Sequence, residues 1–402
     1  MECLVPDEVQ QVLLQQSILA DGPGSILSDF AALLDFIGTD GIKTAGKYHF
    51  IPQSQLEKLN RRMVRPLPHQ LKRPQQRSLP PLHGLYLILR ASGLARVQGE
   101  RLLIDPVMLE QWIDLNPTEQ YFTLLESWLV EGSLEIVAEQ GDDCFDKASW
   151  VFQNLPHIAL GAPVNVNQLP GFLFGTVDLL TVGLMDLFGL IRLTYGQSKA
   201  GGPIIETIER LVFGNAMIAA LQAHYMTYRF AVQDDESDQE VGVLHQLFYP
   251  YFPEWQRTLE PPDLPYRDGT YTLRVSLGKA WRQIEAPADL LLDDLAMAIL
   301  DVYEFDADHL YCFELRDPCG RRLRIACPDE SDADAFTDQL ELGDVPLAEG
   351  GSMTFHFDYG YDWQFSVKLE TVVETDEKLT EPRLTGQGGK APLQYDSDDD
   401  DE

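Results

Sequence analysis

Two aspartates and two histidines in the last third of the sequence are the side chains best suited to chemistry. Asp358 and Asp362 flank Gly360, His356 lies two residues before the first aspartate, and His309 lies further upstream. Carboxylates and imidazoles bind divalent ions and exchange protons. Alternatively, both aspartates hydrogen-bond the backbone of a turn around Gly360, and the histidines are surface residues. A metal site requires more ligands at fixed offsets, so the turn is favoured, and no catalytic residue, metal or cofactor is assigned.

The residues around this turn predict a β-hairpin. Over the stretch Ser352–Glu370, aromatic and aliphatic residues alternate with polar ones on both sides of the segment Asp358–Asp362. A period of two is typical of strands with one buried face, and a central glycine suits a turn or bulge with positive φ. We therefore expect one aromatic face to be buried and Trp363 to belong to the core.

This hairpin resembles the signature of the plasmid pRiA4b ORF-3-like family, also labelled insertion-element passenger or resolvase-like proteins. Matching segments precede it in the same order, at residues 271–277, 281–287, 291–295 and 309–311. Such an ordered set is more specific than any single motif. The residues that match the family motif are Trp281, Arg282, His309, Asp358, Gly360, Asp362 and Trp363.

The resemblance covers about the last third of the chain. Pro382–Tyr395 is similar to the G-x-A-P-x-Q-Y ending of one branch of the family. Many relatives have histidines at the positions of Tyr311 and Phe365 and a cysteine-bearing segment afterwards, which this chain lacks. The resemblance therefore does not imply a metal site here.

The composition indicates a globular, multidomain protein. The chain has 402 residues, 45% of them hydrophobic, and a formal charge of −34. No apolar run approaches the roughly 18 residues of a membrane span, and no secretory leader opens the sequence, so we expect a cytoplasmic protein without membrane contact. Five scattered cysteines without a C-x-x-C motif predict reduced thiols and no disulfide partner. The hairpin predicted around residues 312–327 leaves open whether Cys312 and Cys327 share a face.

One segment runs against the acidic composition. Residues 41–101 contain twelve lysines and arginines but only two acidic residues. Clustered cations of this kind neutralise phosphates, although in an acidic chain they also find carboxylate partners. The candidate nucleic-acid-binding residues are Lys43, Lys47, Arg61, Arg62, Arg65, Lys72, Arg73 and Arg77.

The helix and strand pattern of this region repeats. Helix 82–92, two short strands within 94–104, and a helix 118–130 that begins at Asn116-Pro117 indicate a winged-helix-like domain. Helix 177–188, strands 189–195 and 204–208, and helix 213–223 repeat the pattern. In the C-terminal module, helix 291–303 has an apolar face that is expected to cover a mixed sheet.

These patterns predict an α+β multidomain fold with five parts. Residues 1–140 and 141–235 form two winged-helix-like domains, 236–268 a proline-rich linker, 269–371 the pRiA4b ORF-3-like α+β domain, and 372–402 an acidic disordered tail. The oligomeric state is left open.

Three functions follow from these features. The first is noncatalytic binding of DNA or a DNA-handling protein, in a regulatory role linked to mobile elements. The second is a protein–protein interaction adaptor without nucleic-acid binding. The third is a metal-dependent hydrolase or nuclease at Asp358, Asp362 and His309.

Overall fold

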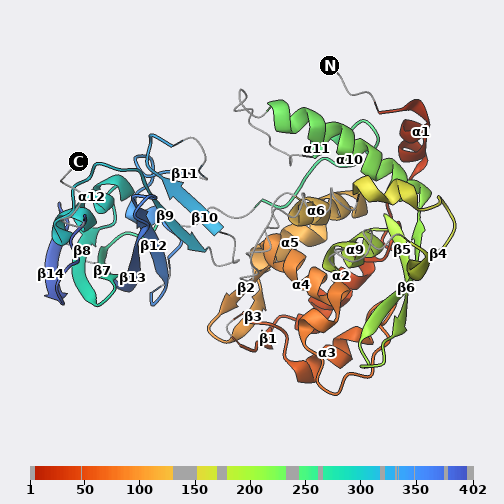
Figure 1. The fold of residues 1–402 in the computed structure, drawn as a ribbon, viewed down its shortest axis with the longest axis horizontal. Helices are drawn as coiled ribbons and strands as arrows, with labels where there is room; N and C mark the ends of the chain where they lie inside the picture. The colour runs from red at the N-terminus through yellow and green to blue at the C-terminus, as the bar shows by residue number, and fades with distance from the viewer. Residues whose placement is uncertain are drawn as a thin grey trace. The chain divides into compact units, whose positions relative to one another are not determined.

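The computed structural model of the protein has an α+β fold in two compact units (Figure 1). The first unit is Met1–Pro262, and the second comprises Asp263–Pro318 and Arg322–Glu402. None of the helices in the described part of the chain combines the length and apolar character that a bilayer crossing requires. The structure describes residues 5–46, 48–129, 152–169, 179–231, 244–260, 266–316, 322–330, 333, 335–347, 349–374 and 379–395.

The first unit contains two small antiparallel sheets with the same strand order. In the first sheet the order is β1-β3-β2, and in the second it is β4-β6-β5, so in each the last strand lies in the middle. A helix directly precedes each hairpin. The elements are α2 (Ile26–Ile37), β1 (Ile42–Lys43), α3 (Gln53–Asn60), α4 (Pro80–Ala91), β2 (Ala95–Gln98) and β3 (Arg101–Ile104), then β4 (Val164–Asn165), α9 (Leu179–Leu187), β5 (Ile191–Gln197) and β6 (Pro203–Arg210).

The helices α4 and α9, which precede the two hairpins, pack against each other (Figure 1). Glycines permit the close approach, because a methyl group added at Gly84 of α4 would lie 2.6 Å from Leu184 Cδ2 of α9. On the other helix, a methyl group at Gly183 would lie 3.3 Å from Pro81 Cγ. Every residue of α4 except Pro81, and every residue of α9 except the first, is buried.

Several of the remaining helices of the first unit pack on this pair or on one another. Asn116 caps α6, since its Oδ1 accepts hydrogen bonds from the backbone N–H groups of Thr118 and Glu119 at 2.9 and 3.0 Å. This is the helix start that Asn116-Pro117 predicts. The elements are α1 (Asp7–Gln15), α5 (Pro106–Asp114), α6 (Pro117–Leu129), α10 (Val212–Ala231) and α11 (His245–Phe248).

One continuous hydrophobic core runs through the first unit, including residues on both sides of the predicted domain boundary at 140. Part of the predicted linker 236–268 also enters this core. Phe248, Phe252 and Trp255 are 0–2% exposed, and Trp255 stacks on Phe122 with ring centroids 4.4 Å apart. Prolines end regular helices and strands but do not prevent burial, so Phe252 and Trp255 pack from the irregular backbone that follows α11.

The second unit is a mixed eight-stranded sheet with one long helix. The strand order is β11-β10-β9-β12-β13-β7-β8-β14, and only the β10–β11 pair is parallel. Helix α12 (Leu292–Tyr303) packs its apolar face on the sheet, as its spacing predicts. The strands are β7 (Thr270–Leu277), β8 (Ala280–Pro287), β9 (Tyr311–Arg316), β10 (Arg322–Ala326), β11 (Ala335–Phe336), β12 (Ser352–Phe357), β13 (Trp363–Val373) and β14 (Arg383–Gly388).

Strand β14 lies within the segment predicted as a disordered tail. It pairs antiparallel with β8 and forms one edge of the sheet, with Leu384 opposite Ile284 and Gln387 opposite Arg282. The acidic residues 396–402 lie outside the described residues. The acidic residues of the predicted tail lie at 374–381 and 396–402, and residues 383–388 contain no acidic residue that would oppose pairing.

Candidate functional site

The predicted hairpin forms from β12 and β13, and Asp358 organises its turn. Asp358 is 3% exposed, and its Oδ1 accepts hydrogen bonds from the backbone N–H groups of Gly360 and Tyr361 at 3.0 and 3.2 Å. Positive φ falls on Asp358 and Asp362, at 49° and 55°, and not on the glycine predicted to adopt it. Aspartate tolerates this region because its short side chain hydrogen-bonds the local backbone.

The second carboxylate oxygen of Asp358 faces His309. Asp358 Oδ2 is buried and has no hydrogen-bond partner among the residues that the structure describes, and His309 Nε2 lies 3.8 Å away. On the other side of the ring, His309 Nδ1 lies 2.8 Å from Asp308 Oδ1. The hydrogen bond to Asp308, together with the charge of Asp358, raises the pKa of His309.

Gln394 and Tyr395 hydrogen-bond the residues that precede this histidine. Tyr395 donates its hydroxyl to Asp308 Oδ1 at 3.0 Å, and the Gln394 amide donates to the backbone oxygen of Asp306 at 3.0 Å. Burial, then the hydrogen bond to Asp308, raises the pKa of Tyr395 to about 12. Sequence reasoning did not assign Asp308, Gln394 or Tyr395 to a site, although the Gln394-Tyr395 ending was a signal that could have found the last two.

The other predicted pair forms a separate contact. His356 Nε2 lies 2.9 Å from Asp362 Oδ1, and that oxygen also accepts a hydrogen bond from the Gln364 amide at 2.8 Å. The four predicted residues are therefore divided into His309–Asp358 and His356–Asp362. Within the described residues, no three His, Cys, Asp or Glu side chains are grouped as metal ligands.

The remaining predicted motif residues support the fold around the hairpin. Arg282 is 8% exposed, donates to the backbone oxygen of Val302 at 2.9 Å and lies over the Tyr303 ring. Trp281 lies beneath the Arg274 guanidinium, 4.2 Å from the ring centroid. Trp363 is partly buried beside the core. Arg282 thus connects β8 to α12, and Trp363 of β13 contacts Phe305 after α12.

Family comparison agrees with this placement. Residues 270–396 match the family model described as plasmid pRiA4b ORF-3-like protein. The pRiA4b ORF-3-like module thus spans about the last third of the chain. It extends past residue 371, where the prediction ends the domain, and includes β14, Gln394 and Tyr395.

Part of the chain is also similar to a solved structure. A crystal structure of a protein of unknown function, MM3350 from Methanosarcina mazei Go1, shows 24% sequence identity and a TM-score of 0.27, over 30% of this chain and 70% of that one. No curated protein matches the chain.

The two described cysteines of the module lie on opposite faces of the sheet. Cys312 pairs with Ala326 across β9 and β10, so the adjacent Cys327 points to the other side. Both are buried free thiols. The question that the predicted hairpin left open is thereby settled for this pair.

The basic segment lies in the first unit, where carboxylates meet four of its eight predicted site residues. The pairs are Lys43–Glu100 at 3.2 Å, Arg61–Glu57 at 2.8 Å, Arg62–Asp35 at 2.7 Å and Arg65–Asp186 at 2.8 Å.

The Arg65–Asp186 contact is the most buried of the four. The Asp186 side chain is 5% exposed, and its Oδ1 also accepts the backbone N–H of Leu193 at 2.9 Å. Burial raises the pKa of Asp186, against the opposing effect of the Arg65 charge. Arg65 thus holds β5 and α9 to the loop after α3.

The other predicted cations differ. Arg77 lies over the rings of Tyr48 and Phe50, each 5.2 Å from the guanidinium. Lys72 and Arg73 are exposed and have no ion-pair partner among the described residues. Lys47 lies outside the described residues.

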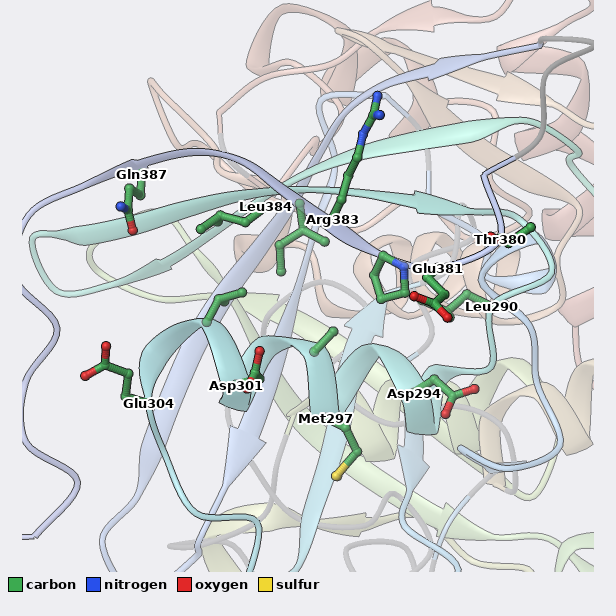
Figure 2. A pocket seen from close by; sticks show the side chains of 14 residues that line it. Leu290, Asp294, Met297, Asp301, Glu304, Thr380, Glu381, Arg383, Leu384 and Gln387 are labelled. Atoms are coloured by element: carbon green, nitrogen blue, oxygen red, sulfur yellow. The ribbon is translucent and has the colours of Figure 1, made fainter.

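The pRiA4b ORF-3-like module has an open groove that sequence reasoning missed. It lies between α12 and β14 and has a volume of about 790 Å³ (Figure 2). Its apolar lining is Ile284, Leu290, Met297, Ala298, Val302 and Leu384, and its charged lining is Asp294, Asp301, Glu304, Glu381 and Arg383.

Proposed function

We propose that the protein is a noncatalytic adaptor that acts through protein–protein contacts. The single observation that carries this proposal is the packing of α4 on α9. Both helices are buried, and they occupy the position directly before a hairpin in each repeated sheet.

We further infer that each repeat is winged-helix-like. The first repeat runs helix, strand, helix, helix and hairpin, and both sheets place the last strand in the middle. In DNA-binding proteins of the helix-turn-helix class, the recognition helix lies in the major groove and must be exposed. Here α4 and α9 would be the corresponding helices. Because they are buried against each other, neither is free to enter a DNA groove.

The charges favour the same conclusion. Four candidate cations lie against carboxylates of their own unit, and the chain carries a formal charge of −34. A protein needs free cations to release counterions from nucleic acid, and a large negative charge repels phosphate.

Nucleic-acid binding is the second candidate, and one observation favours it. Lys72 and Arg73 are exposed neighbours without an ion-pair partner among the described residues, in a proline-rich segment that contacts the β5–β6 turn through a Gln70 N–H to Gly201 O hydrogen bond of 2.7 Å. Two cations at a turn would give weak, salt-sensitive binding.

A capture experiment separates the two candidates. The full-length chain is used as bait in lysate of its own host, with and without nuclease, and any captured protein is purified and mixed with the bait. We expect a captured protein to survive nuclease treatment and to form a stoichiometric complex by light scattering. Loss of all captured protein after nuclease treatment would contradict the adaptor proposal.

A further inference from the structure

We infer that the groove between α12 and β14 is a docking site for a basic amphipathic helix of a partner protein. This inference rests on the proposed adaptor function and specifies its surface and the chemistry of its partner. Three features carry it: an uncovered strip of sheet, an apolar floor, and carboxylates that have no ion-pair partner within the described residues.

The uncovered strip arises from the strand order. Strand β14 extends the sheet beyond β8, and its pairing places Leu384 and Gln387 on the same face as Ile284 and Arg282, the face that α12 covers. Leu384 is nevertheless 43% exposed. Faces of sheets in α+β folds are normally covered by helices, so this strip is a vacant position beside α12.

The floor of the groove is apolar. Ile284 of β8 and Leu290 before α12 contribute to its lining, and Met297, Ala298 and Val302 line it from α12. Burial of apolar surface by a partner is favourable, because it removes that surface from water. A helix beside α12 would lie about 8–10 Å from its axis, the usual spacing of packed helices, and would place one apolar face on this floor.

The walls of the groove are acidic. Asp294 and Asp301 are seven residues apart, so they lie on the same side of α12, roughly 10 Å apart along its axis. Glu304 follows at the end of the helix, and Glu381 lies across the groove before β14. None of the four carboxylates has an ion-pair partner among the described residues.

The one cation in the lining does not neutralise them. Figure 2 shows Asp301 pointing from α12 toward β14, whereas Arg383 points away from α12. Arg383 pairs with Glu285 on the other face of the sheet, with Nη2 2.7 Å from Oε2. The groove is therefore anionic, which favours lysine and arginine in its occupant and opposes phosphate.

The matching occupant is a helix of about three to four turns, because α12 has 12 residues. It would place leucine-like residues at i, i+3 or i+4, and i+7 on the floor, and basic residues about seven positions apart opposite Asp294 and Asp301. An extended peptide added to the free edge of β14 would also find hydrogen bonds, but it would not meet the carboxylates of α12.

The test uses the full-length chain and a synthetic probe. The probe is a fluorescein-labelled 16-residue helical peptide with leucines on one face and lysines and arginines on its flanks. A second peptide has the same composition in an order that destroys the apolar face. Fluorescence anisotropy is measured in roughly 50 mM and 300 mM salt, where exposed ion pairs differ in strength.

The matched variants isolate the carboxylates of the groove. The first is Asp294→Asn/Asp301→Asn/Glu304→Gln. The control, Asp329→Asn/Asp338→Asn/Glu374→Gln, removes the same three charges at exposed positions outside the groove. A third variant, Leu384→Ser, changes the apolar lining without changing charge.

We expect saturable binding of the amphipathic peptide, weakened about tenfold by the groove triple variant, as three exposed ion pairs allow, and less than twofold by the control. Leu384→Ser should weaken it as well, and the scrambled peptide should bind at least tenfold more weakly. Equal binding by both triple variants, or equal binding of both peptides, would overturn the inference.

The same variants separate this inference from the adaptor function. If a nuclease-resistant partner binds the groove triple variant as tightly as the unmodified chain, the groove is not the docking site, and the adaptor function stands. If the groove binds the peptide as expected but every captured protein depends on nucleic acid, the adaptor function fails, and the groove remains a peptide site.

Discussion

In the first unit four of the candidate cations lie against carboxylates of the same unit, whereas the groove of the pRiA4b ORF-3-like module contains four carboxylates without ion-pair partners among the described residues. The two units also differ in exposed surface. In the first unit the repeated helices α4 and α9 are buried, whereas in the second β14 leaves a strip of sheet uncovered beside α12. Clustered charge in a sequence therefore does not by itself locate a binding surface. The charges free to act on a partner are those that the fold leaves unpaired.

The largest expected difference between the units comes from two tryptophans. Trp255 is 0% exposed and stacks on Phe122, whereas Trp363 is partly buried against Phe305. We expect Trp255→Ala to cost about 3–5 kcal/mol of unfolding free energy in the first unit, and Trp363→Ala about 1–2 kcal/mol in the second. Urea unfolding with hydrogen exchange resolved by segment measures both. Equal losses would show that the two sites are packed alike.

A substitution at the α4–α9 crossing tests whether this packing is tight. Gly84→Val would place a larger side chain against Leu184 and should lower the unfolding free energy of the first unit by about 2–3 kcal/mol. Gly202→Val is the control, because the nearest atom to an added methyl group there is 3.7 Å away. Calorimetry compares them, and similar stability of both variants would exclude a close helix contact.

Much of the fold follows from patterns that the sequence displays. Alternation over residues 352–370 predicts the hairpin, the helical spacing of 292–303 predicts the face that α12 buries, and Asn116-Pro117 predicts the start of α6. These patterns involve residues close together in the sequence, so they can be recognised without knowledge of tertiary contacts. The family motif likewise marked His309 and Asp358, which the structure brings together.

The rest depended on long-range pairing. The groove exists because β14, about 100 residues after β8, adds to its edge. The acidic partners of Arg62 and Arg65 lie 27 and 121 positions away in the sequence. The acidic composition therefore predicts that cations pair with carboxylates, but it does not identify the carboxylates. The burial of Trp255 was not predicted, because the prolines around it indicate a linker. Prolines indicate irregular backbone, which can still be buried.

Two arginines of the first unit allow a buried ion pair to be compared with an exposed one. Arg65→Ala would leave the buried Asp186 carboxylate without its cation, and we expect it to cost about 1–2 kcal/mol at neutral pH, since Arg65 is itself half exposed. Arg61→Ala, at an exposed pair with Glu57, should cost less than about 0.5 kcal/mol. Chemical denaturation measures both.

The pH dependence of unfolding shows why Arg65→Ala should cost more stability than Arg61→Ala. Burial already raises the pKa of Asp186, and removing Arg65 should raise it further. A carboxyl whose pKa is raised by folding contributes most stability below its unfolded pKa and loses this contribution as the pH rises through its folded pKa. The cost of Arg65→Ala should therefore shrink as the pH falls toward 4, and a cost independent of pH would contradict a role in charge pairing.

The groove carboxylates should behave differently, because they have no ion-pair partner to lose in the described part of the chain. Neutralising Asp294, Asp301 and Glu304 together should change the unfolding free energy by less than about 0.5 kcal/mol, as is usual for exposed side chains. Thermal melts of the variant and of the Asp329→Asn/Asp338→Asn/Glu374→Gln control provide the measurement. A loss above about 1 kcal/mol would indicate that these charges stabilise the fold.

The smallest effect concerns His309. Its pKa is raised by the hydrogen bond to Asp308, so its contribution to stability should be complete below the unfolded pKa and decline as the pH rises through the raised value. Melting temperatures between pH 5 and 9 should show a small decline that His309→Gln removes. A decline that persists unchanged in the variant would assign it to other groups.

The division between internally paired cations and an anionic groove is tested most directly by duplex binding. A fluorescent 30-base-pair DNA is titrated with the full-length chain at roughly 50 mM salt, where nonspecific contacts are strong. The proposed adaptor function predicts no saturable binding at micromolar protein concentrations. Binding that weakens steeply with salt and is abolished by Lys72→Glu/Arg73→Glu would contradict it and would place the function of the chain at its basic segment.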